Sequence, residues 1–367
     1  MVALTRELIE IPTENPPGAH YGEIVELLTR RLRELGFNDT HVVGDCILSF
    51  TGESDRTLYF SGHYDVVPAQ NREQFVAQVK GANLFGRGSS DMKSGLAAMI
   101  YATVALRESG ALSNGRIGLV FVPDEETAGP RGSRYLAERG LLGQNAIGML
   151  TPEPTGGVIW NGNRGAITLN ITVKGKSAHV GRQHEGVNAF EGMLRVARRI
   201  QELKAEVESS QRSILMLGGR VEGGTNFNVV PDFCAFTLDR RINPGEDFEA
   251  EKRRLEAALD RERETGTELD IETLQEGNAS LVDQNCALGQ ALAHSTETVT
   301  GRRPPFEMCP GLLEIRFYAE REIPAFAYGP GLLTVSHGPH EFVPVQNIEQ
   351  CAAIYAMTAA QLLAPSR

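Results

Sequence analysis

Residues 116–122 (RIGLVFV) limit the possible folds of this chain more than any other segment, because nearly every position is apolar. A strand with one solvated face alternates polar and apolar side chains, whereas a strand covered on both faces is apolar throughout. Residues 146–150 (AIGML) show the same pattern, and residues 57–60 (TLYF) form a shorter strand candidate. We therefore expect a sheet with helices packed against both faces.

Helical patterns alternate with these strands in the first part of the chain. Isoleucine and leucine recur at helical spacing between residues 24 and 35, and Gly36 supplies a C-terminal stop. Further helices are predicted at residues 92–108 and 133–139. Such alternation is typical of an α/β layer built on a largely parallel sheet.

The pattern changes near Arg164. The predicted order is then strand 166–174, helix 190–203, strands 213–217 and 233–239, helix 247–263 and strand 268–273. This β-α-β-β-α-β order is typical of a ferredoxin-like α+β unit. The alternation of helices and strands then resumes, with helices predicted at 284–299 and 347–363 and a strand at 325–328. We expect one α/β domain, residues 1–163 and 276–367, interrupted by an inserted domain at 164–275.

Composition excludes several classes of protein. The formal net charge of -11 disfavours a nucleic-acid partner. No segment approaches the roughly 20 apolar residues that a membrane span needs, and the N-terminus lacks the apolar core of a signal peptide. Five scattered cysteines include no CxxC pair, which argues against a disulfide framework and a cysteine-bound zinc. We expect a soluble, cytoplasmic protein that binds neither nucleic acid nor membrane.

Side chains that can bind metal follow the predicted strands or open the next helix. They are His63, Asp91, Glu125, Glu126 and Glu153, and Asp65 is placed to steer the imidazole of His63. In open α/β sheets, ligands bind at the edge formed by the carboxyl ends of the strands. Imidazole together with carboxylates suits zinc, whereas a site for magnesium would consist of oxygen ligands alone.

Each segment also has an ordinary structural interpretation. Asp91 can be a helix N-cap, and the acidic turn at residues 124–126 can lie on the surface. The prolines that flank Glu153 can form a rigid exit turn, and two histidines near the C-terminus, His337 and His340, can be surface residues. Their joint placement at one sheet edge favours the metal site.

Four separated motifs resemble those of one family of di-zinc metallohydrolases. The motifs are GHYDVVP at 62–68, GRGSSDMKSG at 86–95, PDEE at 123–126 and SHGPHE at 336–341. The family includes aminoacylases, acetylornithine deacetylase, succinyl-diaminopimelate desuccinylase and glutamate carboxypeptidases. The resemblance covers nearly the whole chain. It implies a zinc-exopeptidase-like catalytic domain with a mixed, mostly parallel sheet, an inserted lid and dimerisation domain, and a homodimer.

The resemblance also implies a ligand set for two divalent ions. His63 and Glu153 would hold one ion, Glu126 and His337 would hold the other, and Asp91 would bridge them. Zinc is the expected metal, with cobalt and manganese as alternatives. The family usually has Asn or Asp where this chain has His340, so a choice between His337 and His340 remains open.

The remaining site residues follow from the same resemblance. Glu125 matches the general base that activates a metal-bound water, and Asp65 matches the carboxylate that orients the histidine two positions before it. In the inserted domain, His179 matches a residue that reaches the tetrahedral intermediate, often across a dimer interface. Substrate-binding residues would be Asn228, Arg241 and Arg316, although either arginine can instead make a structural ion pair.

The sequence therefore predicts a hydrolase that cleaves the amide bond of a small N-acylated amino acid or peptide-like substrate. Residues 309–314 (CPGLLE) depart from the family text, so the specificity pocket is expected to be unusual. Leu312 and Leu313 can line an apolar wall or begin a helix. The alternatives are a C–N hydrolase of a carbamoyl or aromatic amine substrate and a metal-binding scaffold without turnover.

Overall fold

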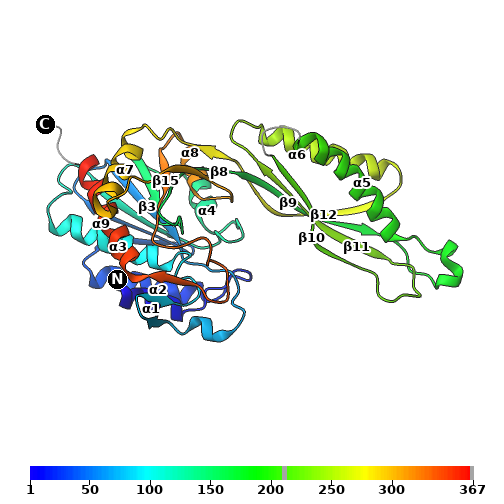
Figure 1. Cartoon of the computed structure of the whole chain (residues 1–367), viewed down its shortest axis with the longest axis horizontal. Helices are drawn as coiled ribbons and strands as arrows, with labels where there is room; N and C mark the ends of the chain where they lie inside the picture. Colours follow the sequence, from blue (N-terminus) through cyan, green and yellow to red (C-terminus); the bar gives the residue numbers. More distant parts are fainter. Residues whose placement is uncertain (209–212, 364–367) are drawn as a thin grey trace. The chain divides into compact units, whose positions relative to one another are not determined.

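The computed structural model describes residues 1–208 and 213–363 (Figure 1). Within this part of the chain there are two compact units. The first unit comprises Met1–Gly162, Ser280–Cys309 and Leu313–Arg367, and the second comprises Asn163–Ala279 and Pro310–Leu312. Among the described residues, no helix is both long and apolar enough to cross a membrane.

The first unit is built on a mixed sheet. Its strands lie in the order β1-β2-β6-β3-β7-β15-β8-β13, with β14 paired to β8. Their bounds are β1 Asp39–Val43, β2 Cys46–Gly52, β6 Arg116–Val122, β3 Thr57–His63, β7 Ala146–Thr151, β15 Ala325–Ala327, β8 Ile159–Asn163, β13 Ser280–Leu281 and β14 Phe306–Cys309. Neighbours in the central run β6-β3-β7-β15 are parallel, whereas β2 is antiparallel to β6.

Helices cover both faces of this sheet, as the apolar strand at 116–122 predicts. The helices of the unit are α1 Val2–Glu10, α2 Tyr21–Glu34, α3 Lys93–Glu108, α4 Ser133–Glu138, α7 Ala287–Thr300, α8 Ile315–Ala319 and α9 Val345–Leu363. Along β6, Leu119 and Phe121 belong to the hydrophobic core shared with α1, α2, α3, α7 and α9. Val120 and Val122 belong to a separate core shared with α4 and α8. Both side-chain sets are buried, as expected for a strand covered on both faces.

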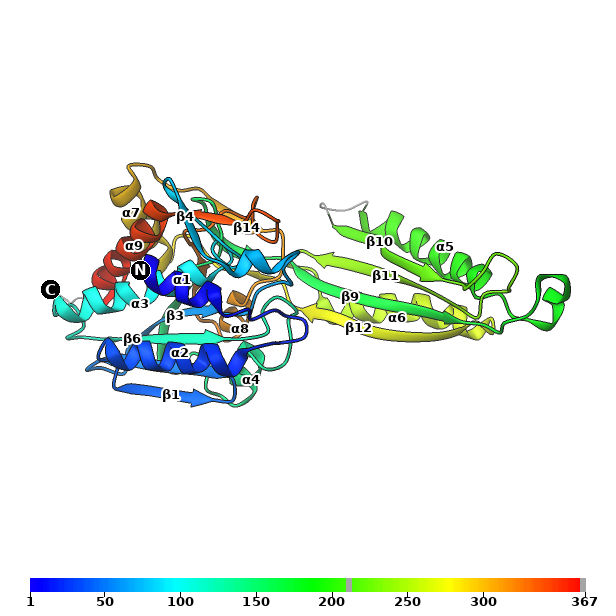
Figure 2. The same cartoon turned by 90° about the horizontal axis from the view of Figure 1, so that it is seen from below.

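The second unit has the β-α-β-β-α-β order predicted from the sequence. Its elements are β9 Gly165–Lys174, α5 Ala189–Glu208, β10 Ile214–Gly223, β11 Phe233–Ile242, α6 Phe248–Glu264 and β12 Glu268–Gly277. The strands form an antiparallel sheet in the order β10-β11-β9-β12. Both helices lie along one face of the sheet (Figures 1 and 2), where Val196, Ile200 and Leu259 pack against Ile171 and Leu238.

A small antiparallel sheet in the first unit joins distant parts of the chain. It has the order β16-β5-β4, with β16 at Phe342–Pro344, β5 at Asn83–Phe85 and β4 at Gln78–Lys80. Phe342 pairs with Phe85, and their rings lie 5.3 Å apart. This pairing aligns the loop that follows β5 with the loop that precedes β16.

Candidate metal centre and active site

The carboxyl ends of three adjacent parallel strands carry most of the candidate site. His63 is the last residue of β3, Glu125 and Glu126 follow β6, and Glu153 follows β7. Because β6, β3 and β7 are neighbours and parallel, these side chains meet at one edge of the sheet. Asp91 joins them from the turn immediately before α3.

One group of potential ligands consists of His63, Asp91 and Glu153. His63 Nε2 lies 3.3 Å from Asp91 Oδ1 and 4.0 Å from Glu153 Oε1. All three residues are buried. A single cation could contact one atom from each residue.

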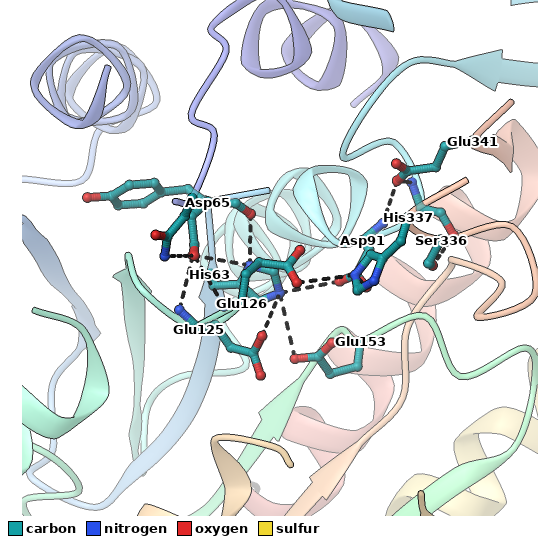
Figure 3. Close-up of polar contacts among 12 residues, drawn as sticks. His63, Asp65, Asp91, Glu125, Glu126, Glu153, Ser336, His337 and Glu341 are labelled. Carbon is teal, nitrogen blue, oxygen red and sulfur yellow. Dashed lines mark hydrogen bonds and ion pairs between the residues drawn. The ribbon is translucent and has the colours of Figure 1, made fainter. Parts of the chain in front are cut away.

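A second group consists of Asp91, Glu126 and His337. His337 Nε2 lies 3.4 Å from Asp91 Oδ2 and 3.2 Å from Glu126 Oε2 (Figure 3). Asp91 therefore offers one carboxylate oxygen to each group, as a bridging ligand would. His340 belongs to neither group within the described residues, and its side chain is exposed.

Asp65 lies behind His63 and holds several parts of the site. His63 Nδ1 lies 3.0 Å from the carbonyl oxygen of Asp65 and 3.4 Å from Asp65 Oδ1. The Asp65 carboxylate also accepts hydrogen bonds from the backbone N–H groups of Glu125 and Glu126, at 3.3 and 3.2 Å. It accepts another from Asn15 Nδ2 at 2.9 Å.

Glu125 is close to the cluster but belongs to neither ligand group of the described residues. Its Oε2 atom lies 3.8 Å from His63 Nε2 (Figure 3). Burial raises the pKa of Glu125 well above its usual value, and the neighbouring carboxylates of Glu153 and Glu126 raise it further. The carboxyl group is thus placed to exchange a proton beside the cluster.

The donor set fits divalent cations. A carbonyl oxygen can only accept, so the bond to Asp65 places the ring proton of neutral His63 on Nδ1 and leaves a lone pair on Nε2. Within the described residues, His63 Nε2, Asp91 Oδ1 and Glu126 Oε1 are buried without a hydrogen-bond partner. Burial also raises the pKa of Glu153 to about 8. Burial thus disfavours the charged carboxylates of the cluster, and bound cations would supply the positive charge that stabilises them.

Comparison with known proteins identifies the family. Residues 59–361 match the sequence profile of "Peptidase family M20/M25/M40". The chain belongs to this peptidase family. It is 29% identical to a succinyl-diaminopimelate desuccinylase of Cereibacter sphaeroides strain KD131, over 96% of each chain. It is 28% identical to an enzyme of that name from Methylocella silvestris, over 97% of this chain and 96% of the relative.

Solved structures of peptidases have the same fold. An M20 metallo-carboxypeptidase from Sulfolobus solfataricus, Sso-CP2, superposes with a TM-score of 0.82 at 16% identity, over 97% of each chain. The di-peptidase Dug1p from Saccharomyces cerevisiae gives 0.79 at 17% identity, over 98% of this chain and 95% of the other. As a member of this family, the protein is a metal-dependent hydrolase of amide or peptide bonds.

The second unit carries two of the remaining predicted M20 site residues side by side. His179 and Val229 form an isolated β-bridge, and Val180 N–H donates to the carbonyl oxygen of Asn228 at 3.0 Å. His179 is exposed, and its Nδ1 accepts from the backbone N–H of Gly181. His179 and Asn228 thus lie on adjacent backbone segments.

The two candidate arginines have different surroundings. Arg241, in β11, forms an ion pair with Asp239 at 2.6 Å, so its guanidinium already has a carboxylate. Arg316, in α8 of the first unit, is only 4% exposed and donates to the carbonyl oxygen of Leu313 at 2.7 Å. Burial lowers the pKa of Arg316, whereas the charges of Glu314 and Glu125 raise it. Arg316 therefore lies within electrostatic range of Glu125.

Several residues of the site region were not assigned functions from the sequence. Arg87 and Glu341 lie in two of the family motifs, and Asn15 lies near the N-terminus outside them. The residue types along a motif do not reveal which atoms these side chains contact. Glu314 is a further buried carboxylate, and burial raises its pKa. Leu313 packs in the core with Tyr318 and is not an apolar pocket wall.

Proposed function

We propose that this protein hydrolyses the amide bond of a small N-acylated amino acid or short peptide at a pair of divalent cations, with Glu125 as the general base. One observation carries the proposal. Two ligand groups share Asp91, while the neighbouring Glu125 lies outside both, 3.8 Å from His63 Nε2. Zinc is the metal that the mixed imidazole and carboxylate donors favour, with cobalt and manganese as alternatives.

The division of labour among the residues follows from their chemistry. Cations bound there would lower the pKa of a water molecule and polarise the substrate carbonyl. Glu125 would take the proton of that water and deliver it to the leaving nitrogen. Asp65 would keep His63 in one tautomer and hold the backbone of residues 125–126.

Substitution of Glu125 by Gln tests the assigned base. The variant keeps the shape of the side chain but cannot accept a proton, so kcat should fall by about 10²–10⁴-fold. Bound metal, measured by inductively coupled plasma mass spectrometry, should remain at the wild-type level. Glu126→Gln is the matched control, because loss of a ligand carboxylate should lower metal content as well as rate. Full activity of Glu125→Gln would reject this role.

The substrate class rests on Arg316 and on the curated relatives, which are named for removal of a succinyl group from an amino acid. A buried guanidinium suits recognition of a substrate carboxylate, and Arg316 meets this requirement better than the ion-paired Arg241. We therefore favour N-acyl amino acids that carry a free carboxylate. Assays against N-acyl amino acids, dipeptides and N-carbamoyl amino acids, each with a carboxylate and with its amide, would separate this class from the carbamoyl alternative.

We assign a lid and dimerisation role to the second unit. His179 would donate to the oxyanion and Asn228 to the substrate, an assignment that rests on their motifs and their adjacent backbone segments. β10 is an edge strand of its sheet, with exposed Met216 and Val221, and such edges pair readily with another chain. Analytical ultracentrifugation of the full chain, with Met216→Lys against Leu274→Lys on the opposite edge strand, would test dimer formation through β10.

The cellular setting is also a proposal. All five cysteines are free, and free buried thiols are typical of a reducing compartment. This supports a cytoplasmic protein. Cell fractionation with an antibody against the chain would test this location.

A further inference from the structure

We propose that Arg87 and Glu341 act as a positioning pair, which sets the spacing between Asp91 and His337 and thereby tunes the second cation site. The inference rests on the proposed two-cation function and extends it to residues that are not ligands. Neither side chain belongs to either ligand group of the described residues. Each instead contacts the backbone of a ligand residue.

Glu341 holds the loop that presents Asp91. Its side chain is buried, and Oε1 accepts from the backbone N–H of Ser90 at 2.9 Å and of Asp91 at 3.0 Å (Figure 3). The Glu341 carbonyl oxygen also accepts from the N–H of Gly86 at 3.1 Å. One residue near the C-terminus therefore fixes both ends of the loop between Gly86 and Asp91.

Arg87 connects this carboxylate to His337. Its Nη1 donates to Glu341 Oε2 at 2.6 Å, and its Nη2 donates to the carbonyl oxygen of His337 at 3.2 Å. His337 has a φ of 64°, a left-handed conformation that is unfavourable for a residue with a Cβ. The guanidinium fork is rigid and planar, so it defines where the His337 backbone lies relative to the Asp91 loop.

A purely structural role would not require charges at these positions. Arg87 is 1% exposed and Glu341 2%, and removing an ion pair from water is energetically costly. Apolar residues of similar size often stabilise a protein equally well or better at such positions. Here the Arg87 guanidinium contacts the backbone of His337, and the Glu341 carboxylate contacts the backbone of Asp91. Such contacts can orient a ligand side chain within a fraction of an ångström.

The contacts predict a selective effect. Arg87 reaches His337, which belongs to the second ligand group only. Among the described residues, the side-chain hydrogen bonds of Arg87 go to Glu341 and His337, whereas His63 and Glu153 are held by β3 and the turn after β7. Loss of the Arg87 fork should therefore weaken the second cation and spare the first. Residues that support ligands in this way typically change metal affinity by about 10–100-fold.

The test uses the full chain with two variants. Arg87→Lys keeps the positive charge but loses the fork. Arg87→Met combined with Glu341→Gln removes both charges, while the Gln amide oxygen can still accept from Ser90 and Asp91. Arg240→Lys is the matched control, because Arg240 is also 1% exposed and pairs with Glu246 at 2.6 Å in the second unit.

Competition with a chelator measures the stepwise affinities for zinc and cobalt. The cobalt absorption spectrum reports the geometry of each site, and circular dichroism reports whether each variant is folded. In both Arg87 variants we expect the second cation to bind about 10–100-fold more weakly, with an altered second-site cobalt spectrum, while the affinity for the first cation stays unchanged. In Arg240→Lys we expect both affinities and the cobalt spectrum to stay at wild-type values. Wild-type affinities in both Arg87 variants, or equal loss of both cations, would overturn the inference. A wild-type protein that binds no divalent ion would instead refute the proposed function.

Discussion

The two ring nitrogens of His63 face different kinds of partner. Nδ1 lies against the carbonyl oxygen and the carboxylate of Asp65, whereas Nε2 faces the carboxylates of Asp91, Glu125 and Glu153. The first contact sets the tautomer, and the second leaves a lone pair among anions. A single residue behind the site, Asp65, thus determines through its carbonyl oxygen which histidine atom is available to a metal.

Substitution of Asp65 by Asn should weaken both metal binding and turnover. The amide loses the charge that supports His63, and its NH2 group cannot accept from the N–H groups of Glu125 and Glu126. We expect about 10–100-fold weaker affinity for the first cation, measured by chelator competition. Asp39→Asn is the control, because Asp39 pairs with His41 at 2.6 Å on the exposed surface. Equal metal affinities in the two variants would contradict the role of Asp65.

At the scale of elements, close backbone approaches hold the turn that carries Glu153. A Cβ added at Gly329 would lie 2.2 Å from the carbonyl oxygen of Pro152 and 2.3 Å from that of Glu153. A Cβ at Gly95, in the first turn of α3, would lie 2.6 Å from Pro152 Cβ. The helix α3 and the segment after β15 therefore enclose the turn after β7, and only glycine fits at these contacts.

Gly329→Ala should displace this turn and affect the first cation more than the second. The added methyl group meets backbone atoms, which cannot rotate away, so we expect about 1–3 kcal/mol of destabilisation. Chemical unfolding and stepwise metal titration would measure both effects. Gly22→Ala is the control, since an added Cβ in α2 has no neighbour within 4 Å and alanine favours the helix. Unchanged first-cation affinity in Gly329→Ala would contradict the prediction.

At the scale of the whole molecule, the cluster links stability to pH. Burial raises the pKa of Glu153 from 4.5 to about 8, and hydrogen bonds with Asp91 and Glu126 raise the pKa of His337 from 6.5 to about 11. Burial alone would raise the pKa of Asp91, but the nearby imidazoles of His337 and His63 lower it below its usual value. In the metal-free protein, bound protons supply the positive charge that cations would otherwise provide.

The metal-free protein should therefore lose stability as the pH rises. A raised pKa in the folded state contributes stability that is complete below the unfolded pKa and disappears as the pH passes the folded pKa. For Glu153 this window runs from 4.5 to about 8. The Tm measured in chelator should fall across that window, and saturating zinc should raise the Tm most at its upper end. A Tm that rises with pH in chelator would contradict this linkage.

Local patterns in the sequence predicted much of this molecule. The apolar run at 116–122 coincides with β6, and the strands at 146–150 and 166–174 correspond to β7 and β9. These segments are recognisable because the burial of a strand on one or both faces produces a characteristic pattern of apolar residues along the sequence. The short edge strands β1 and β4 were missed, since they are partly or fully exposed and carry no regular alternation. The interior strand β2 was missed as well.

The sequence by itself determined the α/β layer, the inserted β-α-β-β-α-β unit and the residue types at the ends of the strands. Only the tertiary structure decided that His337, and not His340, faces Asp91 and Glu126, and that Arg87 meets Glu341. The physical reason is separation along the chain. Periodicity reports what surrounds a residue within a few positions, whereas these contacts join segments about 250 positions apart through the pairing of β5 with β16.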